Sequence, residues 1–400
     1  MRILQLTPKP PVPAVDGGAL AMNSVTESLL SAGHEVKVLC IETKKHPFLP
    51  AKISDEYKNA TRIEAVFIDT SIKITSAFTN LFSSSCYNVD RFYSQEFADK
   101  LTEILEKEHF DIVQLESLYM MPYYSIIRNI TMAHIVLRAH NVEAHLWNRR
   151  TMQEKNVVKK KWFAHLTKNL FEYETKAFTI VDGILPITAE DERTITEMTK
   201  GNIRSIEVLP FSMSLPKIIA ENKPKPFSVF HIGAMDWQPN IEGVIWLVSE
   251  VWPKVIAAIP HAELHLAGRE FPADDERFRG KNIFVHGEIA NAFEFMNEYS
   301  IMTVPLLTGG GMRVKLVEGM ALGKAIVTTS IGAEGTNTEN EKQLMIKNSA
   351  GDFAIAVCQL LNNEIFAREL GHRAKDFAKT HFDSAAASKK LTDFYSNLLK

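Results

Sequence analysis

The sequence predicts an α/β protein built from two doubly wound domains. Its 400 residues exceed the size that one hydrophobic core usually organises. In both halves, short apolar segments alternate with amphipathic helical segments, which is typical of parallel sheets covered by helices. A proline- and lysine-rich stretch at 215–227 lacks periodicity and indicates a linker. We therefore expect domains at 1–213 and 227–383, a linker at 214–226, and a ligand-binding cleft between the two domains.

The first half begins with a strand, followed by a loop that leads into a helix. The apolar pattern of Leu20–Ala32 predicts that helix, and Gly33 suits its C-terminal cap. The loop at 7–18 follows the carboxyl end of the first strand, where open α/β sheets bind ligands. Short apolar runs predict the strands of this half at Ile3–Leu6, Glu35–Cys40, Ile112–Leu115, His134–Arg138 and Ile180–Leu185.

The second half repeats this alternation of strands and helices. We expect a long helix at Ile241–Ile256, with Asn240 as its N-cap. The apolar face of Ser384–Leu399 predicts a C-terminal helix. The expected strands of this half are Phe227–Ile232, Leu264–Ala267, Ile283–His286, Met302–Val304 and Ala325–Thr329.

The composition narrows the class of protein. Hydrophobic residues make up 46% of the chain and charged residues 23%, which is ordinary for a globular protein. The net charge of −3 gives no global sign of nucleic-acid binding. Three scattered cysteines suit a reducing compartment, and neither a signal peptide nor a membrane-spanning run is evident. We therefore expect a cytoplasmic protein.

The segment from Gly309 to Thr329 is the most informative part of the chain. Three glycines lead into a short helix whose N-terminal N–H groups and dipole favour a phosphate group. Lys315 and Glu318, three residues apart, lie on one face of this helix. Gly323 then suits the end of the helix before a buried strand. The segment predicts a site for a phosphate-bearing ligand with hydroxyl groups.

Other interpretations fit this segment less well or remain open. The motif GMALGK at 319–324 is similar to a phosphate-binding P-loop, but its glycines are one residue too close together. Ala325 also stands where that loop requires Ser or Thr. The absence of a G-x-G-x-x-G motif after the first strand disfavours a nicotinamide-dependent dehydrogenase. Glu318 could also be an ordinary solvated helix residue.

Four segments, in order along the chain, carry a family resemblance. They are Asp16-Gly17-Gly18, RAHNVEAHLWNRR (138–150), HIGAMDWQPNIEGVIWLVSEVWP (231–253) and PLLTGGGMRVKLVEGMALGKAIVTTSIGAEG (305–335). With these segments, the chain resembles the family 4 glycosyltransferases of the GT-B fold, particularly those that modify bacterial surface polysaccharides. The resemblance extends over nearly the whole chain and is strongest in the last segment.

This resemblance implies an activity. The C-terminal domain would bind a nucleotide-sugar donor (a UDP-sugar or GDP-sugar), and the N-terminal domain a glycan, lipid-linked or other hydroxyl acceptor. The sugar would be transferred with retention of its anomeric configuration, without a catalytic metal or a resident cofactor. The resemblance also implies that the final helix, at 384–400, crosses back to the N-terminal domain.

The resemblance also assigns residues to the site. Glu318 matches the glutamate that holds the ribose hydroxyls of the nucleotide, and His140 matches a histidine that faces the donor sugar. Gly17 and Gly18 match a flexible loop near the leaving phosphate. The remaining matches are the loop beside the diphosphate, at Gly309, Gly310 and Gly311, and backbone groups that hold the base, at Val285–Ile289.

The sequence departs from the family pattern at two places. Gly310 stands where a glutamate often binds the hydroxyls of the donor sugar, so the identity of that sugar does not carry over. The stretch at 233–240 lacks the two cations that usually neutralise the diphosphate. We hypothesise that Lys315 and Arg313 replace those cations and stabilise the charge that develops on the leaving group.

Further residues suggest contacts with an acceptor or a membrane. Glu143 and Asp16 are candidates for positioning the acceptor. The run Lys159–Lys161, followed by Trp162 and Phe163, fits contact with an anionic membrane, although short lysine runs are mostly solvated helix faces.

Two other functions fit the same sequence. A nucleotide-sugar epimerase of the GT-B fold would also need a diphosphate site and a carboxylate that binds hydroxyls. With Gly310 in place of a glutamate, the protein could instead bind nucleotides or glycans without catalysis.

Overall fold

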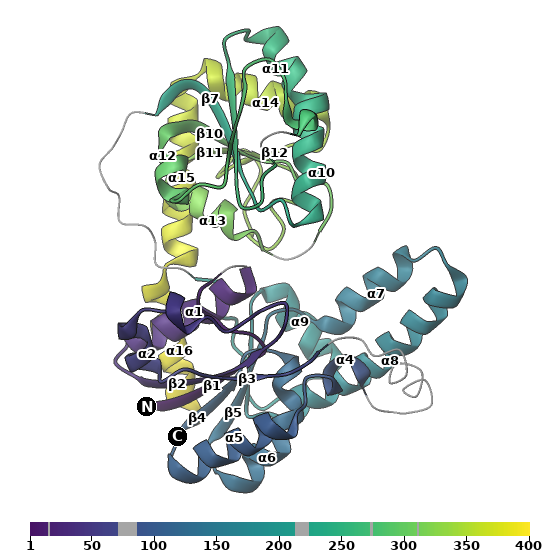
Figure 1. The fold of residues 1–400 in the computed structure, drawn as a ribbon, viewed down its shortest axis with the longest axis vertical. Helices are drawn as coiled ribbons and strands as arrows, with labels where there is room; N and C mark the ends of the chain where they lie inside the picture. Colours follow the sequence, from purple (N-terminus) through teal and green to yellow (C-terminus); the bar gives the residue numbers. More distant parts are fainter. Residues whose placement is uncertain (15–16, 71–85, 213–223, 273–274, 310–311) are drawn as a thin grey trace. The chain divides into compact units, whose positions relative to one another are not determined.

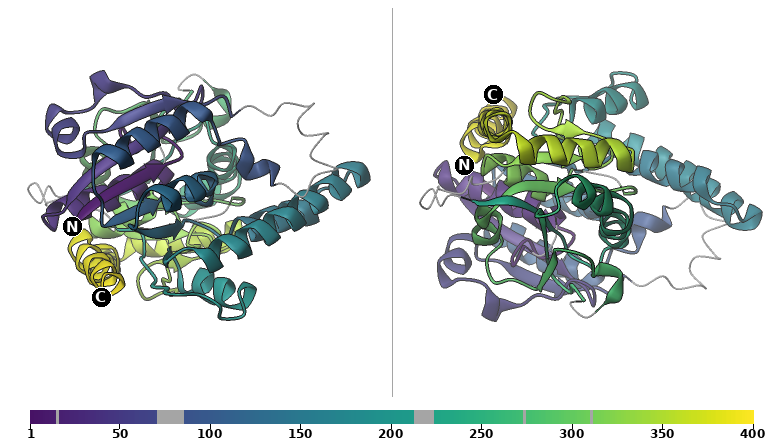
Figure 2. Two further views of the ribbon diagram at one scale, coloured as in Figure 1. Left: turned by 90° about the horizontal axis from the view of Figure 1, so that it is seen from below. Right: turned by 90° about the horizontal axis from the view of Figure 1, so that it is seen from above.

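The computed structural model describes residues 1–14, 17–70, 86–212, 224–272, 275–309 and 312–400. The chain divides into two compact units, Met1–Met213 with Ser384–Lys400, and Ser214–Asp383. Each unit contains a six-stranded parallel sheet covered by helices (Figures 1 and 2). The predicted fold class of two doubly wound α/β domains is confirmed, whereas the ligand-binding cleft stays a prediction.

The sheet of the first unit has the strand order β3-β2-β1-β4-β5-β6. After β3 at one edge, the chain returns as β4 on the other side of β1, so the strand order reverses between these two central strands. The strands are β1 (Arg2–Thr7), β2 (Glu35–Glu42), β3 (Glu64–Phe67), β4 (Ile112–Leu115), β5 (His134–Ala139) and β6 (Gly183–Pro186). The helices are α1 (Gly17–Ser31), α2 (Asp55–Thr61), α4 (Tyr87–Asp90), α5 (Gln95–Lys107), α6 (Tyr124–Ile130), α7 (Glu143–Gln153), α8 (Val157–Ile180), α9 (Ala189–Met198) and α16 (Ser384–Leu398).

The C-terminal helix α16 lies beside α1 on one face of this sheet (Figure 1). Successive residues of a strand point to opposite faces, so Ile3 packs in the cluster with Leu391 and Phe394 of α16, whereas Leu4 belongs to the cluster on the other face. A Cβ on Gly183 would lie only 2.8 Å from the Cζ atom of Phe394, which is too close for a carbon–carbon contact. Glycine at the start of β6 therefore lets α16 pack closely on the sheet.

The sheet of the second unit has the order β12-β11-β10-β7-β8-β9, which is the same topology as in the first unit. The reversal here lies between β7 and β10. The strands are β7 (Lys225–Ile232), β8 (Glu263–Ala267), β9 (Ile283–Gly287), β10 (Tyr299–Val304), β11 (Ala325–Thr328) and β12 (Met345–Ile346). The helices are α10 (Gln238–Trp246), α11 (Trp252–Ala258), α12 (Ala292–Glu298), α13 (Val314–Ala321), α14 (Ala350–Asn362) and α15 (Glu364–Phe382).

The long helix expected at Ile241–Ile256 is divided in three. A five-residue π-helical segment, Leu247–Val251, separates α10 from α11. It ends two residues before Pro253, which has no N–H for an intrahelical hydrogen bond. The N-cap prediction for Asn240 is wrong, because α10 begins earlier and Trp237 is its N-cap. Asn240 instead lies inside the helix with its side chain buried.

Most predicted strands agree with the structure to within three residues, and the differences have physical causes. Ile180 is the last residue of α8 rather than the start of a strand, because its apolar side chain continues the helical pattern. The strands β3 and β12 were not predicted, because they are edge strands of only four and two residues, respectively. Within the described ranges, no helix is both long enough and apolar enough to cross a bilayer.

Candidate functional site

In the first unit, the carboxyl ends of β4 and β5 carry a buried polar cluster. Glu116 directly follows β4, is inaccessible to solvent, and accepts a hydrogen bond of 2.8 Å from Gln5 Nε2 and another from Gln114 Nε2. Arg138 of β5 is also buried, and its Nε lies 3.7 Å from Glu116 Oε2. Burial alone would raise the pKa of Glu116, but the hydrogen bond with His140 and the charge of Arg138 hold that pKa below its usual range. Glu116 is therefore ionised inside the unit.

His140 follows β5 and contacts this carboxylate, with Nε2 3.0 Å from Glu116 Oε2. Burial lowers the pKa of His140, and Glu116 opposes that effect. A neutral ring beside an ionised carboxylate donates its Nε2–H, which leaves Nδ1 as a hydrogen-bond acceptor. The sequence analysis identified His140 but not its partner. Glu116 is the first residue after a predicted strand, and this position at the carboxyl edge of the sheet could have identified it as a candidate site residue.

Glu143 begins α7 and is engaged in contacts within the first unit. Its carboxylate accepts a 2.9 Å hydrogen bond from the hydroxyl of Tyr119. The backbone N–H groups of Glu143 and Ala144 donate to the carboxylate of Glu174 in α8, which caps the N-terminus of α7. Burial raises the pKa of Glu143. Its predicted role in positioning the acceptor stays a prediction, and Asp16 lies outside the described residues.

The diglycine motif differs from its expected local structure. Gly17 and Gly18 are the first two residues of α1, whereas a flexible loop was expected. A small hollow of about 60 Å³ lies beside the start of this helix. Its lining includes Ala19 of α1 and the side chains of Lys9 and Lys45 from the chain that follows β1 and β2.

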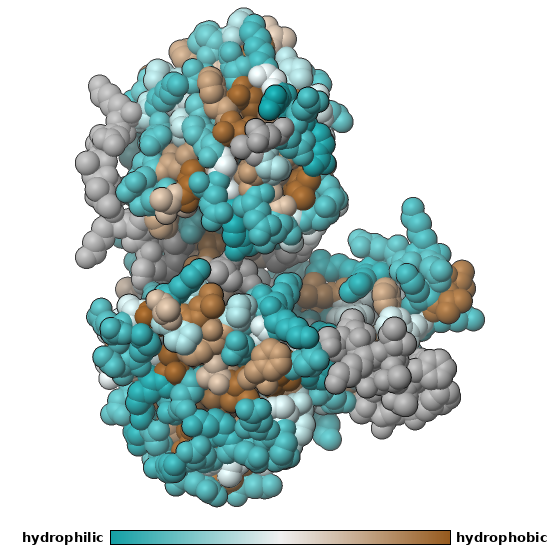
Figure 3. Space-filling view, in the orientation of Figure 1, coloured by the Kyte–Doolittle hydropathy of each residue, from teal (hydrophilic) through white to brown (hydrophobic). Residues whose placement is uncertain are grey.

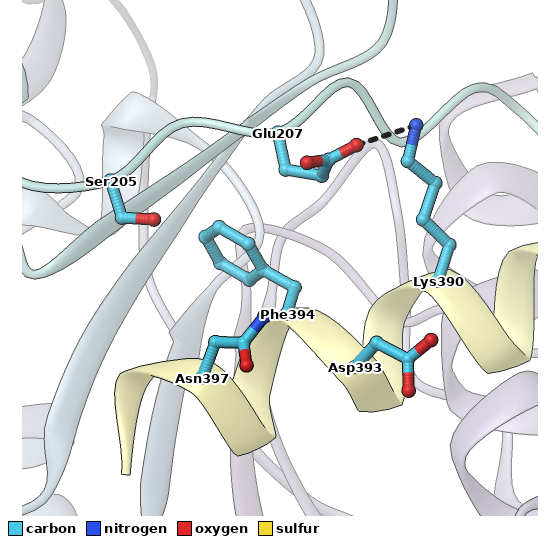
Figure 4. Close-up of a pocket in the computed structure, with 6 residues that line it drawn as sticks. All are labelled: Ser205, Glu207, Lys390, Asp393, Phe394 and Asn397. Carbon is cyan, nitrogen blue, oxygen red and sulfur yellow. Dashed lines mark ion pairs between the residues drawn. The ribbon is translucent and has the colours of Figure 1, made fainter. Parts of the chain in front are cut away.

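A larger hollow of about 320 Å³ in the first unit lies elsewhere (Figure 4). An ion pair of 2.7 Å between Glu207 and Lys390 spans it, and its lining consists of Ser205, Glu207, Lys390, Asp393, Phe394 and Asn397. Because Phe394 packs on Gly183 at the start of β6, this hollow lies at the amino edge of the sheet. His140 and Glu116 lie at the carboxyl edge, so the hollow is not part of the candidate site.

In the second unit, the glycine-rich segment leads into α13 at the carboxyl edge of the sheet. Gly309 has φ +110°, a backbone conformation that glycine tolerates best. A Cβ at this position would lie 3.0 Å from Arg313 Nη2 and 3.2 Å from the ring of Trp237. Gly310 and Gly311 lie outside the described residues.

Lys315, in the first turn of α13, contacts helix α10. Its Nζ donates a 2.7 Å hydrogen bond to Oδ1 of the buried Asn240. The Nδ2 group of Asn240 donates to the carbonyl oxygen of Ala234, which orients Oδ1 toward the lysine. Burial lowers the pKa of Lys315 to about 7; the nearby Arg313 acts in the same direction, and Glu318 opposes it.

Gly233 lies at the centre of a group of polar atoms just after β7. A Cβ on Gly233 would approach His231 Nε2 and Lys315 Nζ to 2.9 Å and Asn240 Nδ2 to 3.0 Å. The buried His231 ring contacts the carbonyl oxygen of Thr303 through Nδ1 (3.0 Å), and burial holds its pKa well below the usual range. The neutral ring donates from Nδ1, so Nε2 is an acceptor beside Gly233. This group lies where the strand order reverses, the position at which open α/β sheets bind ligands.

Two further candidate residues belong to α13: Glu318 lies within the helix, and Arg313 is its N-cap. Glu318 is half-buried in α13, and burial raises its pKa while Lys315 opposes that effect. Arg313 is buried, with its guanidinium 5.0 Å from the centre of the Trp237 ring. Burial lowers the pKa of Arg313, against the attraction of Glu334. The sequence analysis identified Arg313 but not Trp237.

The segment assigned to the base lies farther along the same edge. Val285 is in the edge strand β9, and Ile289 lies just beyond its end. Hydrogen bonds from Gly268 N to the Gly287 carbonyl oxygen (2.9 Å) and from Gly233 N to the Ala267 carbonyl oxygen (3.0 Å) join the ends of β9, β8 and β7. The predicted donor residues of the second unit that the structure describes therefore follow one sheet edge.

No group of three or more His, Cys, Asp or Glu side chains in the described ranges is arranged to hold a metal ion. The described candidate residues of the second unit offer cations, N–H groups and one carboxylate, Glu318. This donor set suits an anionic ligand with hydroxyl groups.

Comparison with known sequences agrees with this description of the second unit. The family model described as glycosyl transferases group 1 matches residues 226–363. Over 402 residues the chain is 25% identical to a Klebsiella pneumoniae protein named "Uncharacterized 44.6 kDa protein in cps region", and the match covers 96% of this chain and 97% of that protein. A shorter match, 31% identical over 112 residues, is to the uncharacterized glycosyltransferase MJ1178 of Methanocaldococcus jannaschii and covers 26% of this chain and 32% of that protein.

Solved structures share the fold of the whole chain. Sucrose-phosphate synthase from Thermosynechococcus elongatus aligns with a TM-score of 0.68 at 15% identity, over 100% of this chain and 99% of that one. A mutant of S. aureus TarM, in complex with fondaparinux, alpha-GlcNAc-glycerol and UDP, gives 0.67 at 11% identity, with 99% and 100% coverage. Anabaena HepE with UDP and glucose gives 0.63 at 11% identity, with 98% and 99% coverage. At these identities the similarity shows the fold alone.

The group 1 domain and the shared fold together support a glycosyltransferase of the GT-B class. Membership of family 4, the surface-polysaccharide type and the role of each site residue stay predictions.

The buried pair in the first unit can be tested by its effect on stability. Glu116→Gln is expected to lower the free energy of unfolding by about 3–5 kcal/mol, because it leaves the buried Arg138 guanidinium without its counter-charge. Chemical denaturation of the full chain measures this change.

A double-mutant cycle is the control for this prediction. The double variant Glu116→Gln, Arg138→Met should lose markedly less stability than the sum of the two single variants, because neither charge is then buried alone. Additive losses, or a Glu116→Gln variant as stable as the wild type, would contradict the coupling.

Proposed function

We propose that the protein is a retaining glycosyltransferase that uses no catalytic metal and moves a sugar from a nucleotide-diphosphate sugar to a hydroxyl acceptor. The observation that carries this proposal is the position of Lys315, at the strand reversal of the second unit and beside the backbone of Gly233. Its hydrogen bond goes to a neutral amide rather than to a carboxylate. A desolvated cation held in this way favours an anionic ligand, and the diphosphate of a sugar nucleotide supplies the counter-charge.

The second unit would bind the donor. The N–H groups at the start of α13 and the ammonium of Lys315 would hold the diphosphate, and Arg313 would add positive charge from its position over Trp237. Glu318, on the same helix, would accept hydrogen bonds from the ribose hydroxyls. As the bond to the sugar breaks, negative charge grows on the leaving diphosphate, and donors that are already in place stabilise that charge without reorganisation.

The first unit would contribute His140 and the acceptor site. With its Nε2–H held by Glu116, the ring presents Nδ1 as an acceptor for a hydroxyl group of the transferred sugar. The retention of configuration rests on the resemblance to family 4 enzymes. Gly310, in place of the usual glutamate, leaves the identity of the sugar unassigned.

The relatives indicate which nucleotide and which acceptor to test first. Structural neighbours were solved with UDP, with UDP-glucose, or with UDP and GlcNAc, which favours UDP over GDP as the leaving group. The Klebsiella pneumoniae relative is named for a cps region, which favours a surface-polysaccharide intermediate as the acceptor. A lipid-linked intermediate would place the reaction in the cytoplasm, at the inner face of the membrane.

Ligand binding separates the contributions of Lys315 and Glu318. Lys315→Ala is expected to weaken both UDP and pyrophosphate by about 10–100-fold, because a charge-assisted hydrogen bond contributes about 1.5–3 kcal/mol. Glu318→Ala should weaken UDP but leave pyrophosphate unchanged, since only UDP carries a ribose. Isothermal titration of the full chain measures both affinities.

The exposed lysine of α11, Lys254, provides the matched control within the same unit. Lys254→Ala should bind UDP and pyrophosphate like the wild type. Wild-type affinity in the Lys315→Ala variant, or equal losses of the two ligands in Glu318→Ala, would contradict the assignment.

Slow hydrolysis of a donor tests for catalysis directly. The wild type is expected to release UDP from UDP-glucose or UDP-N-acetylglucosamine with water as the acceptor, and Lys315→Ala should lower kcat by about 100–1,000-fold. A coupled assay for UDP, run at saturating donor, measures the rate. UDP binding without release from either donor would favour a non-catalytic binding protein, whereas conversion of the sugar without UDP release would favour an epimerase.

The pKa of Lys315 predicts how UDP affinity depends on pH. A bound diphosphate stabilises the charged ammonium, so binding raises this pKa above its free value of about 7. Between about pH 7 and the higher pKa of the complex, binding must take up a proton, and affinity should fall by up to about tenfold per pH unit. Titration of UDP from pH 7 to 9 measures the slope. Lys315→Met should remove the slope, and the same slope in both proteins would refute the linkage.

A further inference from the structure

A helical hairpin in the first unit extends beyond the edge of its sheet (Figures 1 and 2). It consists of α7 and α8, joined by the turn at 154–156. Trp147 of α7 packs edge-on against Phe163 of α8, with ring centroids 5.8 Å apart, and the hydroxyl groups of Thr151 and Thr167 share a 3.1 Å hydrogen bond. These contacts fix the two helices against each other and hold the outer end of the hairpin in one orientation.

The outer end, residues 149–161, is strongly cationic, and we call it the hairpin tip. Six of its thirteen residues are Lys or Arg, and Glu154 is its one carboxylate, which gives the tip a net charge of +5. The chain as a whole carries −3. Lys155, Lys159, Lys160 and Lys161 are all exposed.

The hairpin tip also exposes large apolar side chains. Met152, Val157 and Val158 are 68%, 68% and 78% exposed, respectively. Figure 3 shows apolar surface at the outer end of the hairpin, surrounded by hydrophilic surface. Large apolar side chains this exposed, grouped within a few residues, point to an interaction site.

The structure changes the part of this segment that can contact a membrane. The sequence analysis assigned that contact to Lys159–Lys161 together with Trp162 and Phe163, but Phe163 is buried against Trp147. Trp162 is half-buried and tilted against the Phe163 ring, at 5.4 Å between centroids. The exposed apolar groups lie instead at the turn between the helices.

The order of these groups along α8 suits a layered surface. Val157 and Val158 begin the helix, and Lys159–Lys161 follow within its first turn and a half. At a rise of about 1.5 Å per residue, the last lysine lies roughly 4.5 Å behind Val158 along the axis. The apolar side chains can therefore enter an apolar layer while the ammonium groups remain at an anionic, hydrated layer. The aliphatic part of a lysine side chain can lie along apolar surface while its ammonium group stays in water.

We infer that the hairpin tip docks on an anionic lipid bilayer. Such a surface offers both layers, with acidic headgroups above hydrocarbon. Nucleic acid would attract the lysines but has no apolar phase for Met152, Val157 and Val158. The docking site includes no residue of the candidate sugar-nucleotide site, so this inference does not depend on the proposed function.

Vesicle flotation of the full chain tests the inference. The wild type should bind vesicles of equal parts phosphatidylglycerol and phosphatidylcholine at least tenfold more tightly than vesicles of phosphatidylcholine alone. The triple variant Lys159→Gln, Lys160→Gln, Lys161→Gln should bind the acidic vesicles about 100-fold more weakly. The double variant Val157→Ser, Val158→Ser should lose about tenfold, because less apolar surface is buried.

Exposed lysines elsewhere in the first unit give a control with the same change in net charge. The variant Lys44→Gln, Lys52→Gln, Lys107→Gln should bind acidic vesicles like the wild type. Equal losses in the two lysine variants would overturn the inference, because net charge alone would then explain binding. Unchanged binding of the valine variant would also overturn it, since the tip would then adsorb without insertion. UDP affinity should stay unchanged in all three variants, which separates this result from the proposed function.

Discussion

The reversal of strand order within each sheet is the constraint on which the candidate residues of each unit depend. In the first unit the chain leaves β3 at one edge and returns as β4 on the far side of β1, and the second unit repeats this path with β9, β10 and β7. The connections after the two central strands therefore run in opposite directions, which leaves the sheet edge between them open to side chains. Glu116 follows β4 at one reversal, and Gly233 follows β7 at the other.

The buried charged groups at the two strand reversals have different kinds of partner. In the first unit the buried carboxylate of Glu116 is hydrogen-bonded to His140 and has an ionic partner in Arg138, so its pKa falls despite burial. In the second unit the ammonium of Lys315 is hydrogen-bonded to the neutral Asn240, and its pKa falls because burial disfavours the charged form. The first carboxylate has its counter-charge within the folded chain, whereas the hydrogen-bond partner of Lys315 is neutral, so a bound anion would add a counter-charge there. This difference is the physical reason for proposing the phosphate site in the second unit rather than beside Glu116.

Sequence analysis found the parts of the fold and the site that depend on local spacing. The strands next to the reversals are short apolar runs, and Lys315 and Glu318 share a helix face because they are three residues apart. The partners of these residues could not be found in the same way. Asn240 lies 75 residues from Lys315 in sequence, and its polar side chain next to Pro239 was equally consistent with an N-cap. Glu116 and Trp237 likewise acquire their contacts only when distant strands and loops meet.

The hairpin tip shows how an average over the chain can conceal a local property. A net charge of −3 argues against a partner that covers much of the surface, such as nucleic acid along a basic face. It does not describe the charge density at the end of one helical hairpin, where thirteen residues carry +5. Electrostatic attraction falls off within about 10 Å at ordinary salt concentrations, so a bilayer approaching this end senses mainly these residues. For a contact of this size, the local charge and the three exposed apolar side chains determine the partner, and the composition of the remaining chain has little influence.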